Sequence, residues 1–170
     1  MNLPNKITVA RIAMVPIFIW VLLSGIQNSR IIAAAIFIIA SITDFIDGYL
    51  ARKYKLITDF GKLMDPMADK ILVASALIAL VQIGRISVWP VAIILAREFL
   101  ITSFRSLAAS KGLVIAASIW GKIKTNTQIF AIILLMLTNN PIADIMLWIS
   151  VISTILSAVD YIGKNKKVII

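Results

Sequence analysis

The chain has 170 residues, of which 61% are hydrophobic, and its mean hydropathy is +0.99. Soluble domains contain about 45–50% apolar residues, so this composition excludes an ordinary soluble domain and indicates one domain, residues 1–170, within a lipid bilayer. The chain has no Cys and no His, which excludes disulfides, thiolate metal sites and imidazole catalysis. Any bound metal would need oxygen ligands, as Mg²⁺, Mn²⁺ and Ca²⁺ do.

A helix that crosses a bilayer needs about 20 mostly apolar residues. Apolar stretches of that length follow one another along the chain, separated by short segments rich in Gly, Ser, Asn, Pro or charge. We therefore predict an all-α, polytopic membrane protein with six transmembrane helices, at roughly 7–24, 31–53, 62–84, 88–108, 118–138 and 142–162. Pro90 and Pro141 fall near helix starts, where a missing N–H costs little, whereas Pro16 and Pro66 fall inside helices and should kink them.

The basic residues predict the orientation of these helices. The net charge of +9 would suggest nucleic-acid binding in a soluble protein, but here the basic residues lie between apolar stretches. Only Arg30 and Arg85 fall on one side of the predicted spans, and the other Lys and Arg residues fall at or near the opposite side. By the positive-inside rule that opposite side is cytoplasmic, so both termini should be cytoplasmic and no nucleic-acid partner is expected.

Four of the eight acidic residues fall at the cytoplasmic ends of the second and third predicted helices. Asp44 and Asp47 are three residues apart on one helix, and Asp65 and Asp69 are four apart on the next, so each pair shares a helix face. Carboxylates near hydrocarbon are costly, which indicates a function. A single such aspartate could be a proton relay or an interhelical hydrogen-bonding group. Four of them on adjacent antiparallel helices could instead hold two divalent ions, an arrangement suited to displacement at phosphorus.

Small residues and one arginine accompany the aspartates. Gly48, Ala51 and Gly61 leave space in which a flat group can approach the backbone, and Arg52 offers a fork suited to phosphate. Small residues in membrane helices also serve close helix packing, which is the alternative interpretation of each one alone.

The whole pattern resembles the signature of the CDP-alcohol phosphotransferase family at every motif position. It reads Asp44-x-x-Asp47-Gly48-x-x-Ala51-Arg52, then eight residues, then Gly61-x-x-x-Asp65-x-x-x-Asp69. The resemblance implies a homodimer and a site for two Mg²⁺ or Mn²⁺ ions. It implies that the metal ligands are Asp44, Asp47, Asp65 and Asp69, with Asp69 also the catalytic base. It further implies a cytidine nucleotide site formed by Asp44, Asp47, Gly48, Ala51, Arg52 and Gly61.

The flanking sequence is similar to one branch of that family, the bacterial phosphatidylglycerophosphate synthases. The similar segments are Asn2–Arg11, Asp65–Lys70, Arg97–Phe99 and Gly121–Gln128. This similarity implies CDP-diacylglycerol as donor, sn-glycerol 3-phosphate as acceptor and CMP as by-product. It also implies a multi-pass protein of the bacterial cytoplasmic membrane whose active site faces the cytoplasm. Arg97 and Glu98 could equally form a structural ion pair.

An anionic acceptor requires cations and hydrogen-bond donors of its own. Candidates at the cytoplasmic helix ends are Thr8, Arg11, Arg105, Lys122 and Lys124. The alternative role for such residues is anchoring the helices and contacting anionic lipid headgroups.

Two other functions remain open at this point. The first is a sister enzyme that uses the same donor with serine, inositol phosphate or another acceptor. The second is a cation or proton transporter, but transporters often show repeats in both halves, and the acidic cluster falls in one half only.

Overall fold

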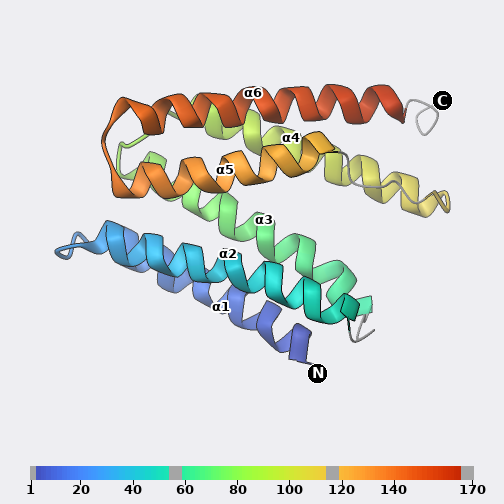
Figure 1. Ribbon diagram of the computed structural model, residues 1–170, viewed down its shortest axis with the longest axis horizontal. Coiled ribbons are helices and arrows are strands. Elements are labelled where there is room, and N and C mark those ends of the chain that lie inside the picture. Colours follow the sequence, from blue (N-terminus) through green and yellow to red (C-terminus); the bar gives the residue numbers. More distant parts are fainter. Residues whose placement is uncertain (1–2, 54–58, 114–118, 166–170) are drawn as a thin grey trace. The chain divides into compact units, whose positions relative to one another are not determined.

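The computed structural model describes residues 3–53, 59–113 and 119–165, and within these ranges the chain forms six α-helices and no strand (Figure 1). Side chains are not described for residues 3–5, 44–53, 59–60, 62–63 and 66. The helices are α1 Leu3–Leu23, α2 Ser29–Lys53, α3 Asp59–Gln82, α4 Val88–Ser110, α5 Ile119–Leu137 and α6 Pro141–Lys164. Each lies within a few residues of a predicted helix, so the all-α prediction is confirmed.

The helices group into two compact units. The first unit comprises Met1–Arg85 together with Leu135–Thr138, and the second comprises Ile86–Leu134 together with Asn139–Ile170. Helices α1, α2 and α3 therefore belong to the first unit, and α4, α6 and most of α5 belong to the second. The single domain expected over residues 1–170 stays a prediction.

In the first unit, α1 packs along both α2 and α3, whereas the described parts of α2 and α3 contact each other much less. Phe18 of α1 and Phe37 of α2 are fully buried, and their ring centroids lie 6.0 Å apart. Ala33 and Ala40 are also fully buried on α2. Small residues let membrane helices approach closely, so α1 is the helix that holds α2 and α3 together.

In the second unit, α4 packs against α6. Ile101, Phe104 and Ala108 of α4 form a buried cluster with Tyr161 of α6. The rings of Phe104 and Tyr161 meet edge to face, with centroids 5.8 Å apart, which is a favourable aromatic geometry.

The helices end and begin at Gly, Asn and Pro residues of the short segments that separate the apolar stretches. After α3 the chain turns at Gly84, whose φ of +69° favours glycine, and the N–H of Arg85 donates to the Leu80 carbonyl at 2.9 Å. Helix α6 begins at Pro141, and the preceding Asn140 side chain accepts a hydrogen bond from the N–H of Ile142 at 3.0 Å. The prediction that Pro141 lies near a helix start is confirmed.

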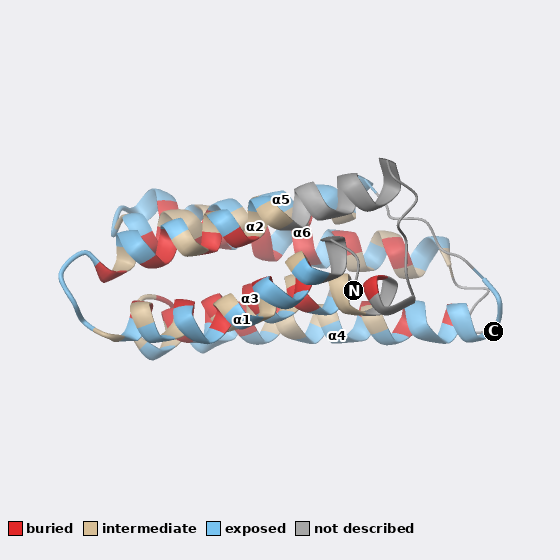
Figure 2. Cartoon of the chain, turned by 90° about the horizontal axis from the view of Figure 1, so that it is seen from below, coloured by how far each residue is buried: buried red, intermediate tan, exposed pale blue. Residues whose placement is uncertain are grey.

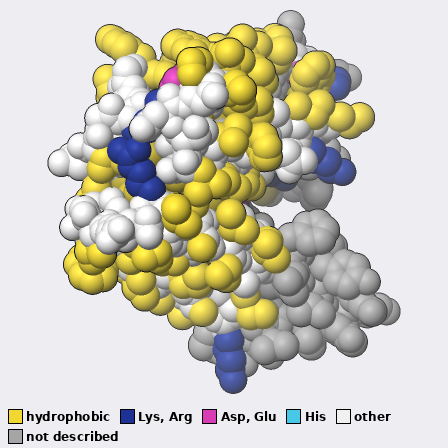
Figure 3. Space-filling model, turned by 60° about the vertical axis from the view of Figure 1, so that its left-hand side comes forward, with side chains coloured by type: hydrophobic (Ala, Val, Ile, Leu, Met, Phe, Trp, Pro, Cys, Tyr) yellow, Lys and Arg dark blue, Asp and Glu magenta, His cyan; other side chains and the backbone are white. Residues whose placement is uncertain are grey.

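The exposed surface is strongly apolar. Every helix carries exposed residues as well as buried ones (Figure 2), and hydrophobic side chains cover much of the face shown in Figure 3. The four tryptophans are all exposed by 41% or more. Exposed tryptophan and isoleucine side chains on this scale are typical of a surface in contact with lipid.

Two described segments are long and apolar enough to cross a membrane, Lys6–Leu23 of α1 and Pro141–Lys164 of α6. A shorter apolar stretch, Ser29–Thr43, lies in the part of α2 whose side chains are described. The structure thus supports six helices and two candidate spans, and the six-span topology remains a proposal.

Candidate functional site

The acidic residues of α3 lie on a single stripe of the helix. Gly61, Asp65 and Asp69 are spaced by four residues, so they follow one another along one side of α3. Gly61 is buried and both carboxylates are partly buried. Ala68 and Leu72, which lie beside and beyond them, are almost completely buried. The two carboxylates therefore lie along the packed side of α3 and retain partial access to solvent or a ligand.

Helix α1 contacts this stripe through a threonine. The Thr8 hydroxyl donates a hydrogen bond of 2.6 Å to Oδ1 of Asp65. Thr8 itself has no exposed surface. A hydroxyl carries one proton, and the Thr8 hydroxyl uses it to donate to a carboxylate of the acidic motif.

Helix α1 also contacts α2 through an arginine one turn further along. Arg11 is 1% exposed, and its Nε donates to the carbonyl oxygen of Ala40 at 3.2 Å. The Thr43 hydroxyl donates to the same carbonyl at 2.7 Å. Ala40 lies one turn before Asp44, so the Arg11 contact fixes α1 against the turn of α2 that leads into the acidic motif.

The α2 half of the motif is described only in its backbone. Asp44, Asp47, Gly48, Ala51 and Arg52 all lie in the last turns of α2, and their side chains are outside the described residues. Their predicted roles as metal and nucleotide ligands therefore stay predictions.

The chemistry of the described donors fits a hard divalent cation. Asp65 and Asp69 offer carboxylate oxygens, which Mg²⁺ and Mn²⁺ prefer. Among the side chains that the structure describes, no three acidic residues come together as a metal site. A complete four-carboxylate site requires Asp44 and Asp47 from α2.

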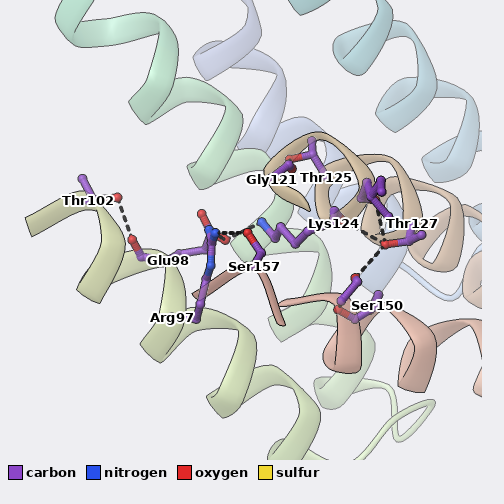
Figure 4. Close-up of polar contacts among 11 residues, drawn as sticks. Arg97, Glu98, Thr102, Gly121, Lys124, Thr125, Thr127, Ser150 and Ser157 are labelled. Carbon is purple, nitrogen blue, oxygen red and sulfur yellow. Dashed lines mark hydrogen bonds and ion pairs between the residues drawn. The ribbon is translucent and has the colours of Figure 1, made fainter. Parts of the chain in front are cut away.

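A second polar cluster lies inside the second unit. Oε1 of Glu98 pairs with Nη1 of Arg97 at 3.1 Å and also with the ammonium of Lys124 (Figure 4). Nη2 of Arg97 donates to the hydroxyl of Ser157 at 2.6 Å. The side chains of Arg97 and Glu98 are each 13% exposed and that of Lys124 is 7% exposed. Helices α4, α5 and α6 are thus joined by a nearly buried charge network.

The network carries two positive charges and one negative charge among these residues. Beside it on α5, Gln128 is 2% exposed, and its Nε2 has no hydrogen-bond partner among the described residues. A buried donor without a partner is costly, so this cluster is suited to binding an anion or water.

The five candidates for binding an acceptor phosphate divide between the two units. Thr8 and Arg11 are buried in the first unit with the partners given above. Lys124 is nearly buried in the second unit, where it pairs with Glu98, and Arg105 and Lys122 are exposed there. From the sequence, Ser157 and Gln128 received no role of their own, and Glu98 was a candidate only for an ion pair with Arg97. Glu98 could have been found as an ionisable residue inside an apolar helix, which indicates function by default.

Comparison with known proteins places this arrangement in a family. Residues 1–156 match the family model described as CDP-alcohol phosphatidyltransferase. The chain is 45% identical to the CDP-diacylglycerol–glycerol-3-phosphate 3-phosphatidyltransferase of Bacillus subtilis, with 96% of this chain and 95% of that protein covered. It is 40% identical to the protein of the same name from Rickettsia bellii, with 98% and 96% covered.

A third relative carries a related name. The chain is 40% identical to the probable phosphatidylglycerophosphate synthase of Mycobacterium tuberculosis, over 96% of this chain and 81% of that protein. The family match covers most of the chain, including the whole acidic motif on α2 and α3. The chain therefore belongs to the CDP-alcohol phosphatidyltransferase family.

Proposed function

We propose that this protein is a phosphatidylglycerophosphate synthase, which transfers the phosphatidyl group of CDP-diacylglycerol to sn-glycerol 3-phosphate and releases CMP. The observation that carries the proposal is that an intact acidic motif lies within a chain that resembles enzymes of that name over nearly its full length. The names of these relatives supply the identity of the acceptor, because the acidic motif resembles the signature of the whole family.

The four aspartates of α2 and α3 would hold two divalent ions, either Mg²⁺ or Mn²⁺. The oxygen-only donor set fits these metals, and Asp65 and Asp69 already share one stripe of α3. Bound ions of this kind would neutralise the carboxylates and polarise the diphosphate of the donor. Gly48, Ala51, Arg52 and Gly61 would line the cytidine nucleotide site.

The protein residues would then direct one displacement at phosphorus. Asp69 would accept the proton of the C1 hydroxyl of glycerol 3-phosphate as that oxygen attacks the lipid-linked phosphorus. The bond between this phosphorus and the oxygen of CMP would break, and CMP would leave with the electron pair. Positioning and charge compensation supply most of the rate in such reactions, so a rigidly held carboxylate set matters more than an unusual base.

Basic residues would bind the acceptor phosphate. In the second unit we assign this role to Arg105, Lys122 and Lys124, of which Lys124 is supported by its place in a nearly buried network with a surplus of positive charge. Arg11, the remaining basic candidate, lies in the first unit, and its role in binding the acceptor stays a prediction. Thr8 was a further candidate, and its contact with Asp65 supports a different role, argued below.

The membrane arrangement is part of the proposal. The exposed apolar surface and the two candidate spans support a membrane protein. We propose six spans, cytoplasmic termini and an active site facing the cytoplasm of a bacterial cell. A homodimer is proposed on the family resemblance alone.

The direct test is turnover by the purified protein in detergent micelles that contain CDP-diacylglycerol. With sn-glycerol 3-phosphate and Mg²⁺ or Mn²⁺ we expect phosphatidylglycerophosphate and CMP in equal amounts. Chelation of the metal should stop both. Formation of CMP together with phosphatidic acid in place of phosphatidylglycerophosphate would contradict transfer and indicate hydrolysis instead.

A further inference from the structure

We propose that Thr8 is a positioning residue for the metal site: its hydroxyl fixes the carboxylate of Asp65 so that the second oxygen is presented to a divalent cation. The inference rests on the proposed function in one respect, the assignment of Asp65 as a metal ligand. It replaces the expectation that Thr8 binds the acceptor phosphate.

The hydrogen bond itself is the first argument. Thr8 donates to Oδ1 of Asp65 at 2.6 Å, a short distance typical of a hydroxyl bound to a carboxylate. A phosphate group at neutral pH accepts hydrogen bonds, so Thr8 could bind one through its hydroxyl only by giving up Asp65.

Burial is the second argument. Thr8 has no exposed surface, and Asp65 is only partly buried. The hydroxyl therefore approaches the carboxylate from the packed side, between α1 and α3, and the accessible part of the carboxylate lies elsewhere. Ligating carboxylates in metal sites are usually held in this way by a hydrogen bond from a neighbouring residue.

The position of Thr8 on α1 is the third argument. Thr8 and Arg11 lie one turn apart on the buried side of α1. Thr8 contacts α3 at Asp65, and Arg11 contacts α2 at the carbonyl of Ala40, one turn before Asp44. Because α1 packs closely on both helices, these two contacts set the register of the acidic residues on α3 against those on α2.

The test compares three full-length variants by direct Mn²⁺ binding, measured by electron paramagnetic resonance without any substrate. Thr8→Val keeps the shape of the side chain and removes the hydroxyl, so we expect Mn²⁺ affinity to fall about 10-fold or more. Thr8→Ser keeps the hydroxyl and should restore most of the affinity. Thr154→Val is the matched control, because Thr154 is equally buried and its hydroxyl has no partner among the described residues.

The outcomes separate this proposal from the proposed function. Equal Mn²⁺ affinity in wild type and Thr8→Val would overturn the role of Thr8, even if lipid transfer is confirmed. Wild-type protein that transfers lipid but binds no Mn²⁺ would overturn it as well. If Thr8→Val weakens Mn²⁺ binding, Thr8→Ser restores it and Thr154→Val leaves it unchanged, the role of Thr8 is supported. These three results would support the role of Thr8 even if the protein turned over no acceptor. Absence of turnover would count against the proposed function alone.

Discussion

Glu98 of α4 and Lys124 of α5 form an ion pair although they are 26 residues apart in the chain. The same oxygen of Glu98 also pairs with Arg97, so one carboxylate compensates two cations in a place with little access to water. An ionised lysine or arginine is costly to bury alone. Glu98 therefore supplies a shared counter-charge for both cations inside the second unit.

The first prediction concerns the stability that Glu98 provides. Glu98→Gln leaves two cations without their shared counter-charge, and breaking a buried pair in this way costs about 3–5 kcal/mol. We expect a clear fall in the midpoint of thermal unfolding in detergent. Asp160→Asn is the control, since Asp160 pairs with Lys164, whose side chain is 67% exposed, and such pairs contribute about 1 kcal/mol or less. Equal losses in the two variants would contradict a special role for Glu98.

The second prediction concerns the acceptor. Lys122 is exposed, so Lys122→Met should leave the fold intact and remove one contact to the acceptor phosphate. Hydrogen bonds to charged groups contribute about 1.5–3 kcal/mol, which corresponds to a rise in KM for glycerol 3-phosphate of about tenfold or more. Steady-state kinetics should show no comparable change in KM for CDP-diacylglycerol. Lys164→Met serves as the exposed control, and the same rise in that variant would indicate a general effect of surface charge.

The third prediction concerns the base. Asp69→Asn removes the proton acceptor and one metal ligand from α3, and loss of a general base typically lowers kcat by about 10²–10⁴. The rate of CMP release from saturating substrates measures this. Asp144→Asn is the comparison, because Asp144 lies in the first turn of α6, away from the acidic motif in sequence, and complements the helix dipole there. If CMP release survives in Asp69→Asn at near the wild-type rate, Asp69 is not the base.

The fourth prediction concerns topology, and the absence of cysteine makes it direct. Single cysteines at Gln27 and Asn139, both exposed between helices, should react with an impermeant maleimide from outside intact cells. A cysteine at Lys111, exposed after α4, should react only after the membrane is opened. Labelling of all three from the same side would contradict the six-span arrangement.

The helices could be predicted from the sequence because their ends are marked locally. Gly84 allows the turn after α3, and Asn140 with Pro141 begins α6, so these boundaries depend on neighbours in the chain alone. The possible ion pair of Arg97 with Glu98 was foreseen for the same reason and is present. The number of membrane spans is harder to predict from the sequence, because the helices that bear the acidic motif also contain charged residues. Helix α2, for example, is charged from Asp44 onward.

The contacts that organise the site could not be predicted from the sequence. Thr8 and Asp65 are 57 residues apart, and only the packing of α1 on α3 brings them together. From the sequence, Thr8 was one more donor near a helix end, suited to phosphate as well as to a carboxylate. Lys124, likewise, was only a cation near a helix end. Its pairing with Glu98 depends on how α4 and α5 are placed within the second unit.

The central claim is transfer of a phosphatidyl group to glycerol 3-phosphate, and a competition between acceptors tests it most directly. Purified wild-type protein would receive CDP-diacylglycerol, Mn²⁺ and equal concentrations of isotopically distinct sn-glycerol 3-phosphate, serine and inositol phosphate, and the lipid products would be separated by mass spectrometry. We predict that phosphatidylglycerophosphate is the dominant product, formed in equal amount to CMP. Phosphatidylserine or phosphatidylinositol phosphate as the main product, with little phosphatidylglycerophosphate, would contradict the proposed function.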